Sequence, residues 1–265
     1  MIPDPDSVTA LLRRAATEII LPRFQKLARH QIREKGPGDL VTIADTEAER
    51  LLTPLLAALV PGSVVVGEEA VAADRDVLQR LAGTAGVWLI DPVDGTFNFA
   101  HGDPNFAVIV AFVEHGHVRA GWIHEPVDGE TVWAIAEQGA WRDHRRLIVP
   151  EPPPPEKMVG IVSGRLPNGR RARGALEAGG WPGRMGSIRC AGRTYAKLAA
   201  GEFHYAYFSR SMPWDHAAGW LIHREAGGYG AFLDGAGYSP LRSDHPLLLA
   251  PDRATWNKLH ALLAT

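Results

Sequence analysis

The chain has few of the features that mark a secreted, membrane or nucleic-acid-binding protein. Cys190 is the only cysteine among 265 residues, which excludes an internal disulfide and a thiolate-cluster metal site. Lysine and arginine total 28 against 30 acidic residues, so the net field favours neither nucleic acid nor an anionic membrane surface. No apolar run approaches about 18 residues, and the N-terminus carries acids where a secretory signal carries basic residues. We therefore expect a soluble, cytoplasmic protein with neither nucleic-acid nor membrane partners.

The composition is that of a globular protein with a sizeable core. Hydrophobic residues make up 46% of the chain and charged residues 22%, which suits one large domain or two small ones. The proline-rich segment at residues 150–155 can form neither a helix nor a central strand. It predicts a boundary between subdomains at residues 1–150 and 151–265, which we expect to form one compact unit.

Two helices are predicted near the N-terminus. Apolar residues recur at helical spacing over residues 7–24, with Pro22 as a kink or an end. A second helix is predicted to be capped by Thr46, because Glu49 follows three residues later and leucines recur after it. Pro54 falls inside this second segment, where a proline lacks the amide that a helix interior needs.

Short apolar runs predict strands in the first half. Residues 64–66 and 87–90 have the pattern of buried strands, and each runs directly into acidic residues. Residues 106–113, 118–124 and 131–136 are separated by turn signals, so we expect them to pair as an antiparallel meander. Carboxylates should therefore stand at the ends of two buried strands.

The second half alternates strand-like and helix-like segments, which is typical of an α/β arrangement. These segments span residues 158–162, 170–176, 193–200, 204–208 and 214–226. No fixed repeat period is present, so neither a solenoid nor a propeller is expected. The sequence thus predicts a mixed α+β and α/β protein.

Residues 91–96, with the sequence DPVDGT, follow the predicted strand and carry the strongest chemical signal. The proline stops a continuing ladder and Gly95 permits a turn, so the loop can aim Asp91 and Asp94 inward. The amides of Gly95 and Thr96 could bind an anion if a short helix begins there. Asp, Pro and Gly are also common in ordinary turns, so the motif alone leaves that alternative open. A calcium-binding EF-hand loop is set aside, because position twelve is a glycine in place of a bidentate Glu.

Other acidic residues could join this loop. Glu68 and Glu69 follow residues 64–66 and should stand at the carboxyl edge of a sheet, although paired acids are also common on surface loops. Asp215 stands where a helix should begin, and helix capping explains it as well as metal binding does. Asp45 likewise precedes a predicted cap. The histidines lack metal-pair spacing and are interpreted as surface, core or supporting residues: His101, His124, His216 and His223.

The order of four motifs resembles the inositol monophosphatase family. They are DLVTIAD at residues 39–45, GEE at 67–69, DPVDGTFN at 91–98 and WDHAAG at 214–219. The resemblance spans nearly the whole chain, and the third motif is highly specific when the fourth accompanies it. It implies a layered α-β-α-β-α sandwich, shared with fructose-1,6-bisphosphatases, and a homodimer.

The resemblance also implies roles for particular residues. Asp45 and Thr96 would position and activate the attacking water, and the amides of Gly95 and Thr96 would hold the phosphate. Two to three magnesium ions are implied, and Glu68 would help to hold the third. The implied metal ligands are Glu68, Asp91, the Val93 carbonyl, Asp94 and Asp215.

The physics of an acidic cluster points the same way. Two carboxylates about 4 Å apart repel by roughly 4 kcal/mol at an effective dielectric constant of about 20, so an ionised cluster needs cations. Oxygen ligands suit Mg²⁺, with Mn²⁺ as a substitute. Such cations would lower the pKa of a bound water and neutralise charge on the leaving alkoxide. We therefore expect direct attack by metal-activated water, without a covalent phosphoenzyme.

The substrate is less well defined than the reaction, because the chain departs from the family pattern. Phe97 stands where many members have a second Thr, and Phe208 replaces a Glu that contacts inositol hydroxyls. The segment at residues 189–194 aligns near the substrate ring, where Arg193 is a bulky cation. The candidate substrate contacts are Arg189, Arg193, Thr194 and Phe208. Seven arginines cluster in the second half, namely Arg165, Arg170, Arg171, Arg173, Arg184, Arg189 and Arg193. They form either solvated faces or a guanidinium site for a second phosphate or a carboxylate.

Three hypotheses follow for the function. The first is a magnesium-dependent phosphatase acting on a small phosphorylated metabolite of the inositol or sugar monophosphate type, with the lithium sensitivity that the resemblance implies. The second is a 3'-nucleotide or bisphosphate phosphatase, or a histidinol-phosphate phosphatase. The third is a dimeric scaffold without catalysis, against which the intact set of acidic residues argues.

Overall fold

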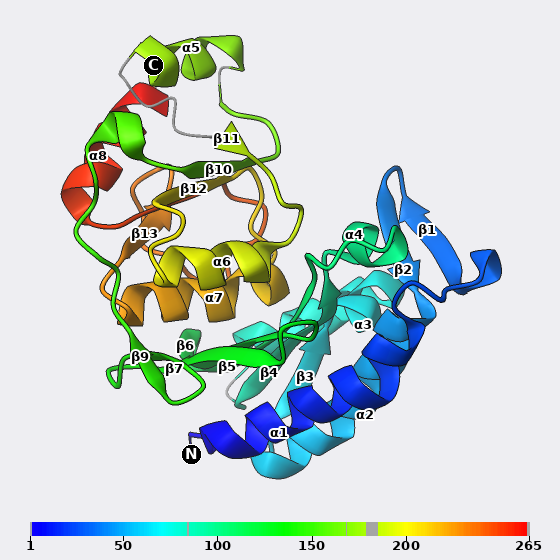
Figure 1. The fold of residues 1–265 in the computed structure, drawn as a ribbon. Coiled ribbons are helices and arrows are strands. Elements are labelled where there is room, and N and C mark those ends of the chain that lie inside the picture. Colours follow the sequence, from blue (N-terminus) through cyan, green and yellow to red (C-terminus); the bar gives the residue numbers. More distant parts are fainter. Residues whose placement is uncertain (1, 84, 168, 179–184, 264–265) are drawn as a thin grey trace.

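The computed structural model describes residues 2–83, 85–167, 169–178 and 185–263, which form five alternating layers of helices and sheets (Figure 1). In Figure 1, α1 and α2 cover one face of a first sheet, α6 and α7 lie between this sheet and a second, and α5 and α8 cover the far face of the second. These helices are α1 (Pro5–Ala15), α2 (Ile43–Leu59), α5 (Arg170–Ala178), α6 (Ala191–Ala199), α7 (Pro213–Glu225) and α8 (Arg253–Leu263). The expected α-β-α-β-α sandwich is confirmed.

The first sheet has seven strands in the order β3-β4-β5-β6-β7-β8-β9. They are β3 (Val64–Gly67), β4 (Val87–Asp94), β5 (Ala107–Glu114), β6 (His117–Glu125), β7 (Glu130–Ile135), β8 (Ala140–Arg142) and β9 (Arg145–Leu147). Only β3 and β4 pair in parallel, and the expected meander of β5, β6 and β7 is confirmed. Helices cover both faces, which explains why β4 begins as an unbroken apolar run: Trp88 packs with α1 and α2, and Leu89 with the opposite layer.

The second sheet has the order β11-β10-β12-β14-β13. Its strands are β10 (Gly160–Ser163), β11 (Met185–Gly186), β12 (Tyr205–Phe208), β13 (Tyr229–Phe232) and β14 (Leu247–Ala250). The first three in the spatial order are parallel, and β14 is antiparallel to both of its neighbours. The alternation predicted for the second half is therefore present, whereas β13, β14 and α8 were not predicted.

The two N-terminal helices begin earlier than the sequence suggested. Asp4 caps α1 by accepting a hydrogen bond from the amide of Ser7 at 2.8 Å, and the segment ends in a 3₁₀ turn that contains Pro22. The expectation that Thr46 caps the second helix is wrong, because α2 begins one turn earlier with Thr42 as its N-cap. Pro54 lies inside α2 without ending it.

One hydrophobic cluster connects the two sheets through α6 and α7. It includes Ile109 of β5, Leu198 of α6, Leu221 of α7 and Leu249 of β14, all at most 1% exposed. The proline-rich segment runs between β9 and β10, and the proposed boundary at residue 150 stays a prediction. Among the described residues, no helix is long and apolar enough to cross a membrane.

A hairpin and two short helices complete the fold near the ends of β3 and β4. A separate hairpin is formed by β1 (Ile32–Gly36) and β2 (Asp39–Thr42), which leads directly into α2. The helix α3 (Glu68–Ala73) follows β3, and α4 (Thr96–Ala100) follows β4. Both short helices therefore begin where a strand of the first sheet ends.

Candidate active site

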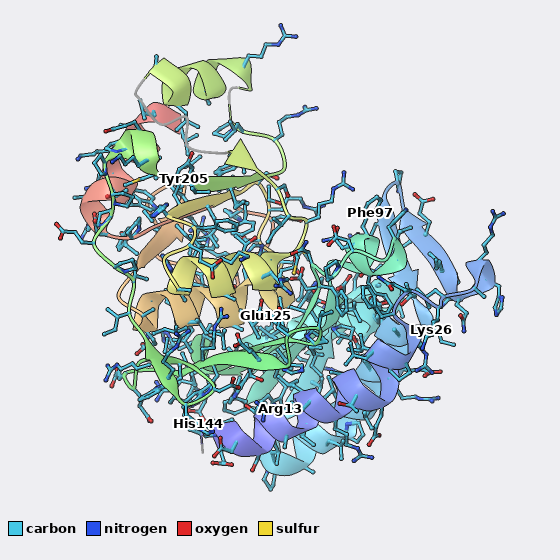
Figure 2. The ribbon with its side chains drawn as sticks, in the orientation of Figure 1. Arg13, Lys26, Phe97, Glu125, His144 and Tyr205 are labelled. Atoms are coloured by element: carbon cyan, nitrogen blue, oxygen red, sulfur yellow. The ribbon has the colours of Figure 1, made fainter. Side chains whose placement is uncertain are left out.

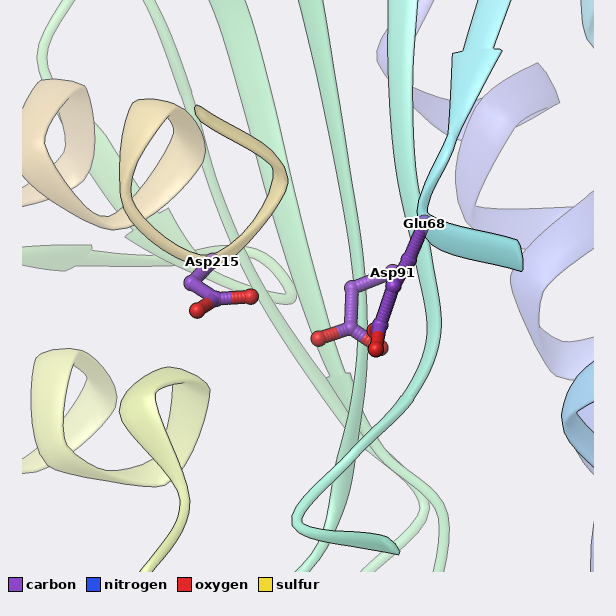
Figure 3. A group of neighbouring side chains, drawn as sticks. All are labelled: Glu68, Asp91 and Asp215. Carbon is purple, nitrogen blue, oxygen red and sulfur yellow. The ribbon is translucent and has the colours of Figure 1, made fainter. Parts of the chain in front are cut away.

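Three carboxylates from distant parts of the chain meet at one edge of the first sheet. Glu68 opens α3, Asp91 lies near the end of β4, and Asp215 lies in the first turn of α7. One oxygen of each lies within 4.8 Å of an oxygen of the other two. Figure 3 shows the carboxyl groups of Glu68 and Asp91 ending together, with Asp215 approaching from α7. The cluster thus joins the two halves of the chain.

Asp91 and Asp94 reach the same face of the sheet because β4 carries a bulge. Asp91 pairs with Ile109 of β5 and Asp94 with Ala107, so three steps along β4 match two along β5. Residues three apart in a regular strand point to opposite faces, and the extra residue returns Asp94 to the face of Asp91. Gly95 follows with a φ of +87°, and a Cβ there would lie 2.8 Å from a backbone oxygen. Only glycine suits this turn into α4.

Thr96 and Asp45 form a second polar pair beside the cluster. Thr96 Oγ1 lies 3.0 Å from Asp45 Oδ1 and 2.9 Å from the Val93 carbonyl oxygen. The other oxygen of Asp45 accepts hydrogen bonds from the amide and hydroxyl of Thr42, at 2.8 and 2.5 Å. This capping box at the start of α2 fixes the Asp45 carboxyl, so that its Oδ1 faces Thr96.

Asp94 anchors the N-terminus of α6. Its carboxylate accepts hydrogen bonds from the Cys190 thiol at 2.9 Å, the Ala191 amide at 3.1 Å and the Gly192 amide at 2.6 Å. Negative charge is favourable at a helix N-terminus. A carboxylate has about four lone-pair sites, so three donors leave room for a cation. Asp94 therefore holds the start of α6 in place and still lines the cleft.

Glu68 is positioned by Glu49, for which the sequence pattern predicted only a local capping role. Glu49, on α2, accepts hydrogen bonds from the amides of Glu69 and Ala70, both at 2.9 Å. A Cβ on Gly67 would lie 2.2 Å from the Glu49 carboxyl carbon, so the glycine makes room for it. Glu49 thus caps α3 from a neighbouring helix and fixes the turn that carries Glu68.

Lys35 brings a positive charge to the cluster from the β1–β2 hairpin. Its Nζ lies 2.6 Å from Glu68 Oε1 and 3.0 Å from Glu69 Oε1. Burial lowers the pKa of Lys35, but the two glutamates outweigh burial and raise that pKa above its ordinary value. No sequence pattern pointed to this residue, because a lysine in a Gly- and Pro-containing hairpin is usually solvated.

The carboxylates of the site are not fully compensated by protein groups. Burial and the neighbouring Glu68 raise the pKa values of Asp91 and Asp215 well above the ordinary range. Burial also raises the pKa of Asp45 to about 7 and that of Asp94 to about 6. An ionised cluster at neutral pH therefore needs added cations. Its clustered oxygen donors fit a hard divalent ion such as Mg²⁺.

Asp94 and Asp215 line a cleft of about 700 Å³. Phe97 of α4, Arg189 from the loop before α6 and Phe208 of β12 line it as well. The size falls within the range of small-molecule sites. The cleft can therefore admit a small molecule to Asp94 and Asp215.

Three of the four predicted substrate contacts line this cleft: Arg189, Thr194 and Phe208. The Phe208 ring stacks on Tyr195 at 5.5 Å between centroids and meets the edge of His216 at 4.6 Å. The Thr194 hydroxyl donates to the Cys190 carbonyl at 2.8 Å. Phe208 therefore presents an apolar wall to the cleft.

Arg193 lies in a different ionic network. Its guanidinium lies 2.8 Å from Asp128 and 3.3 Å from Glu125, and it donates to the Pro104 carbonyl. Figure 2 shows Glu125 well apart from Phe97, which lines the cleft. These partners occupy the Arg193 guanidinium, and Arg193 is not among the residues that line the cleft. Arg184, another arginine of the predicted group, lies outside the described residues.

Three of the four histidines are held in the core. His216 Nδ1 lies 2.9 Å from the Tyr195 hydroxyl, and burial lowers the pKa of this histidine to about 3. His124 contacts the Thr131 hydroxyl, and His223 Nε2 contacts a backbone carbonyl. His101 stacks on Phe97. The exposed His101 and the three buried histidines fit their interpretation as surface, core or supporting residues.

Residues 4–265 match the inositol monophosphatase family. The chain belongs to that family. It is 33% identical over 199 residues to a fructose-1,6-bisphosphatase/inositol-1-monophosphatase of Thermotoga maritima, covering 74% of this chain and 72% of the relative. It is 32% identical over 220 residues to an inositol-1-monophosphatase of Rhizobium meliloti, covering 81% and 80%.

The fold agrees with this membership. A solved inositol monophosphatase of Thermotoga maritima superposes with a TM-score of 0.81 at 26% identity, covering 98% of this chain and 96% of that one. Inositol monophosphatases are phosphoric monoester hydrolases, so the chain is an enzyme of this class.

Proposed function

We propose that the chain is a magnesium-dependent phosphatase for small phosphate monoesters of the inositol-phosphate or sugar-phosphate type. The observation that carries the proposal is the meeting of Glu68, Asp91 and Asp215 within 4.8 Å, with Asp215 also lining the cleft. Mutual repulsion makes such a group unfavourable when ionised, unless cations bind it. We assign two to three Mg²⁺ ions, or Mn²⁺ in substitution, to Glu68, Asp91, the Val93 carbonyl, Asp94 and Asp215.

Bound magnesium would acidify a water and offset the charge that develops on the phosphoryl and leaving oxygens. The chain's own groups then orient the reactants. The Thr96 hydroxyl donates to Asp45 Oδ1 at 3.0 Å, so a lone pair of Thr96 Oγ1 can accept a hydrogen bond from the attacking water. As that water attacks phosphorus, its proton passes to Thr96 Oγ1 and the Thr96 proton passes to Asp45 Oδ1. The amides of Gly95 and Thr96 hold the phosphoryl oxygens at the start of α4.

A panel of phosphate monoesters tests this proposal. Purified protein is assayed for phosphate release from inositol 1-phosphate, sugar phosphates, 3'-phosphoadenosine 5'-phosphate and histidinol phosphate, with Mg²⁺ and with EDTA. We expect release that requires Mg²⁺. Folded protein that releases no phosphate from any member would overturn the proposal and favour a dimeric scaffold without catalysis.

Family membership adds three expectations to the proposal: a homodimer, inhibition by lithium, and a cytoplasmic location. Size-exclusion chromatography with light scattering measures the first, and a monomer at working concentration would contradict it. Lithium titration in the phosphate assay measures the second. Full phosphatase activity in a large excess of lithium over substrate would count against a mechanism shared with the inositol monophosphatase family.

A further inference from the structure

Arg193 of α6 connects this helix to the first sheet. Its Nη2 lies 2.8 Å from Asp128 Oδ2 and its Nε lies 3.3 Å from Glu125 Oε1, while its Nη1 donates to the Pro104 carbonyl at 3.3 Å. Glu125 ends β6, Asp128 lies in the turn that follows, and Pro104 precedes β5. One guanidinium group therefore contacts three separate points of the first sheet and its loops.

The ion pair between Arg193 and Glu125 is largely buried. The Glu125 side chain is 3% exposed and the Arg193 side chain 14%. Arg142 of β8 approaches the other oxygen of Glu125, at 3.6 Å, and also pairs with Glu130 at 2.7 Å. Burial raises the pKa of Glu125 above its ordinary value, although both guanidinium groups act to lower it. Because solvent screens this pair little, it contributes more than an exposed ion pair does to holding α6 on the sheet.

The backbone of the same helical turn holds Asp94. The amides of Ala191 and Gly192 donate to its two carboxylate oxygens, at 3.1 and 2.6 Å. The Arg193 amide donates to the Cys190 sulfur at 3.4 Å, and the Cys190 thiol donates to Asp94 at 2.9 Å. The residue whose side chain reaches the first sheet thus directly follows the two amides that fix the direction of the Asp94 carboxylate.

Gly192 lets this turn lie directly against β5 and β6. A Cβ at position 192 would lie 3.0 Å from the Ala107 Cβ, 3.1 Å from Ile123 Cγ2 and 3.2 Å from Asp94 Oδ2. These distances are shorter than ordinary van der Waals contacts, so the close approach of the helix depends on glycine. Because hydrogen bonds weaken steeply as their geometry departs from the optimum, a small displacement of this turn would change how Asp94 is held.

Lys197, one turn further along α6, forms a different kind of ion pair. Its Nζ lies 2.5 Å from Glu202 Oε2, in the segment that follows the helix. This pair lies within the second half of the chain and does not join α6 to the first sheet. Lys197 therefore offers a matched comparison for Arg193, with the same helix and the same sign of charge.

On the basis of the proposed function, in which Asp94 is a metal ligand, we propose that Arg193 is a positioning residue for Asp94. Its contacts with the first sheet hold the first turn of α6 where the Ala191 and Gly192 amides orient the Asp94 carboxylate for metal binding. Arg193 is not among the residues that line the cleft, so it acts through the helix backbone and not on the substrate.

Calorimetric Mg²⁺ binding and thermal unfolding in EDTA test this proposal without relying on turnover. In Arg193→Met, the apparent Kd for Mg²⁺ should rise by about tenfold or more, as is typical when a group that supports a metal ligand is lost. The unfolding temperature should fall, because Glu125 loses a buried partner. Lys197→Met should keep the wild-type Kd. An unchanged Kd in folded Arg193→Met would overturn the inference.

A double variant separates positioning from stability, and carries the test if Arg193→Met alone does not fold. Arg193→Met with Glu125→Gln removes both charges of the buried pair, while Arg142 keeps its contact with Glu130, so the unfolding temperature should return towards wild type. The contact that holds α6 is still missing, so the apparent Kd for Mg²⁺ should stay raised.

Recovery of the wild-type Kd together with the unfolding temperature would show that Arg193 affects stability alone, and would overturn this inference while the proposed function stands. Wild-type protein that binds no Mg²⁺ in the calorimeter would overturn the proposed function itself, and this inference with it.

Discussion

Thr96 Oγ1 lies 3.0 Å from Asp45 Oδ1, which links the first residue of α4 to the first turn of α2. The two residues come from separate motifs, and each is fixed by its own local structure. Asp45 is held by the capping box with Thr42, and Thr96 follows the glycine turn at the end of the bulged strand. The pair lies beside the metal ligands without being a member of the cluster of three carboxylates.

Removing the Thr96 hydroxyl should affect the reaction more than binding. Thr96→Val keeps the volume but cannot orient a water, so we expect kcat to fall by about 10²-fold or more with little change in KM. Thr96→Ser retains the hydroxyl and should keep most of the activity. Steady-state phosphate release measures both. A Val variant within a few-fold of wild type would remove Thr96 from the proposed chemistry.

Glu49 should control metal binding from outside the cluster. Glu49→Gln replaces one acceptor oxygen by an NH₂ group that faces an amide donor, which loosens the turn carrying Glu68. Groups that support metal ligands typically contribute 10- to 100-fold in affinity, so the Mg²⁺ concentration for half-maximal activity should rise by about tenfold or more. The exposed Glu156→Gln is the control. An unchanged Mg²⁺ requirement would show that the cap does not position Glu68.

Lys35 should compete with magnesium for Glu68. Lys35→Met removes the ammonium group from Glu68 and Glu69, so the metal-free protein should unfold at a lower temperature than wild type. Calorimetry should show tighter Mg²⁺ binding to the variant, because no ammonium is displaced. The exposed Lys258→Met should change neither quantity. Weaker Mg²⁺ binding by Lys35→Met would contradict this competition.

The stabilising effect of magnesium should grow with pH. Burial raises the pKa of the proposed ligand Asp94 to about 6 and the pKa values of Asp91 and Asp215 well above the ordinary range. The metal-free folded chain therefore binds more protons than the unfolded chain from the ordinary pKa values near 4 to about 6 and above, whereas bound Mg²⁺ would keep these ligands ionised. The stability that these protonated carboxyl groups give to the metal-free protein is therefore lost as the pH rises through that range. The buried histidines act in the opposite direction, but they contribute equally with and without metal.

The measurement is the unfolding temperature at saturating Mg²⁺ minus that in EDTA, from pH 5 to pH 8. We expect this difference to increase by several degrees, since about 1 kcal/mol shifts Tm by a few degrees in a domain of this size. A difference that does not vary with pH would show that the carboxylates do not titrate together with metal binding.

The sequence predicted the clustered carboxylates better than the groups that support them. Its motifs singled out Glu68, Asp91 and Asp215, whose carboxylates meet in the structure. The bulge that turns Asp91 and Asp94 to one face was not predicted, because it depends on pairing with β5. Glu49 was assigned to a capping box with Thr46, whereas Thr42 and Asp45 satisfy the same spacing one turn earlier. Local patterns alone do not choose between two such boxes.

Contacts across the chain were the least predictable. Arg193 and Arg189 stand four residues apart in one basic segment, and the sequence offered both as substrate contacts. In the folded structure Arg193 forms an ion pair with Glu125, whereas Arg189 stacks on Phe97 at the cleft. These contacts depend on tertiary packing, which local sequence does not show. The final strands β13 and β14 were likewise missed, because short buried strands have no distinctive period.

The central claim is that Glu68, Asp91 and Asp215 hold the divalent ions that drive phosphate ester hydrolysis. The most direct test is Mg²⁺-dependent phosphate release by wild type and by Asp215→Asn, with circular dichroism as the check on folding. We predict that EDTA abolishes wild-type turnover and that Asp215→Asn lowers kcat/KM by about 10³-fold or more, because bound metal contributes several kcal/mol to the transition state. Wild-type turnover that persists in EDTA, or a folded Asp215→Asn variant as active as wild type, would contradict the account.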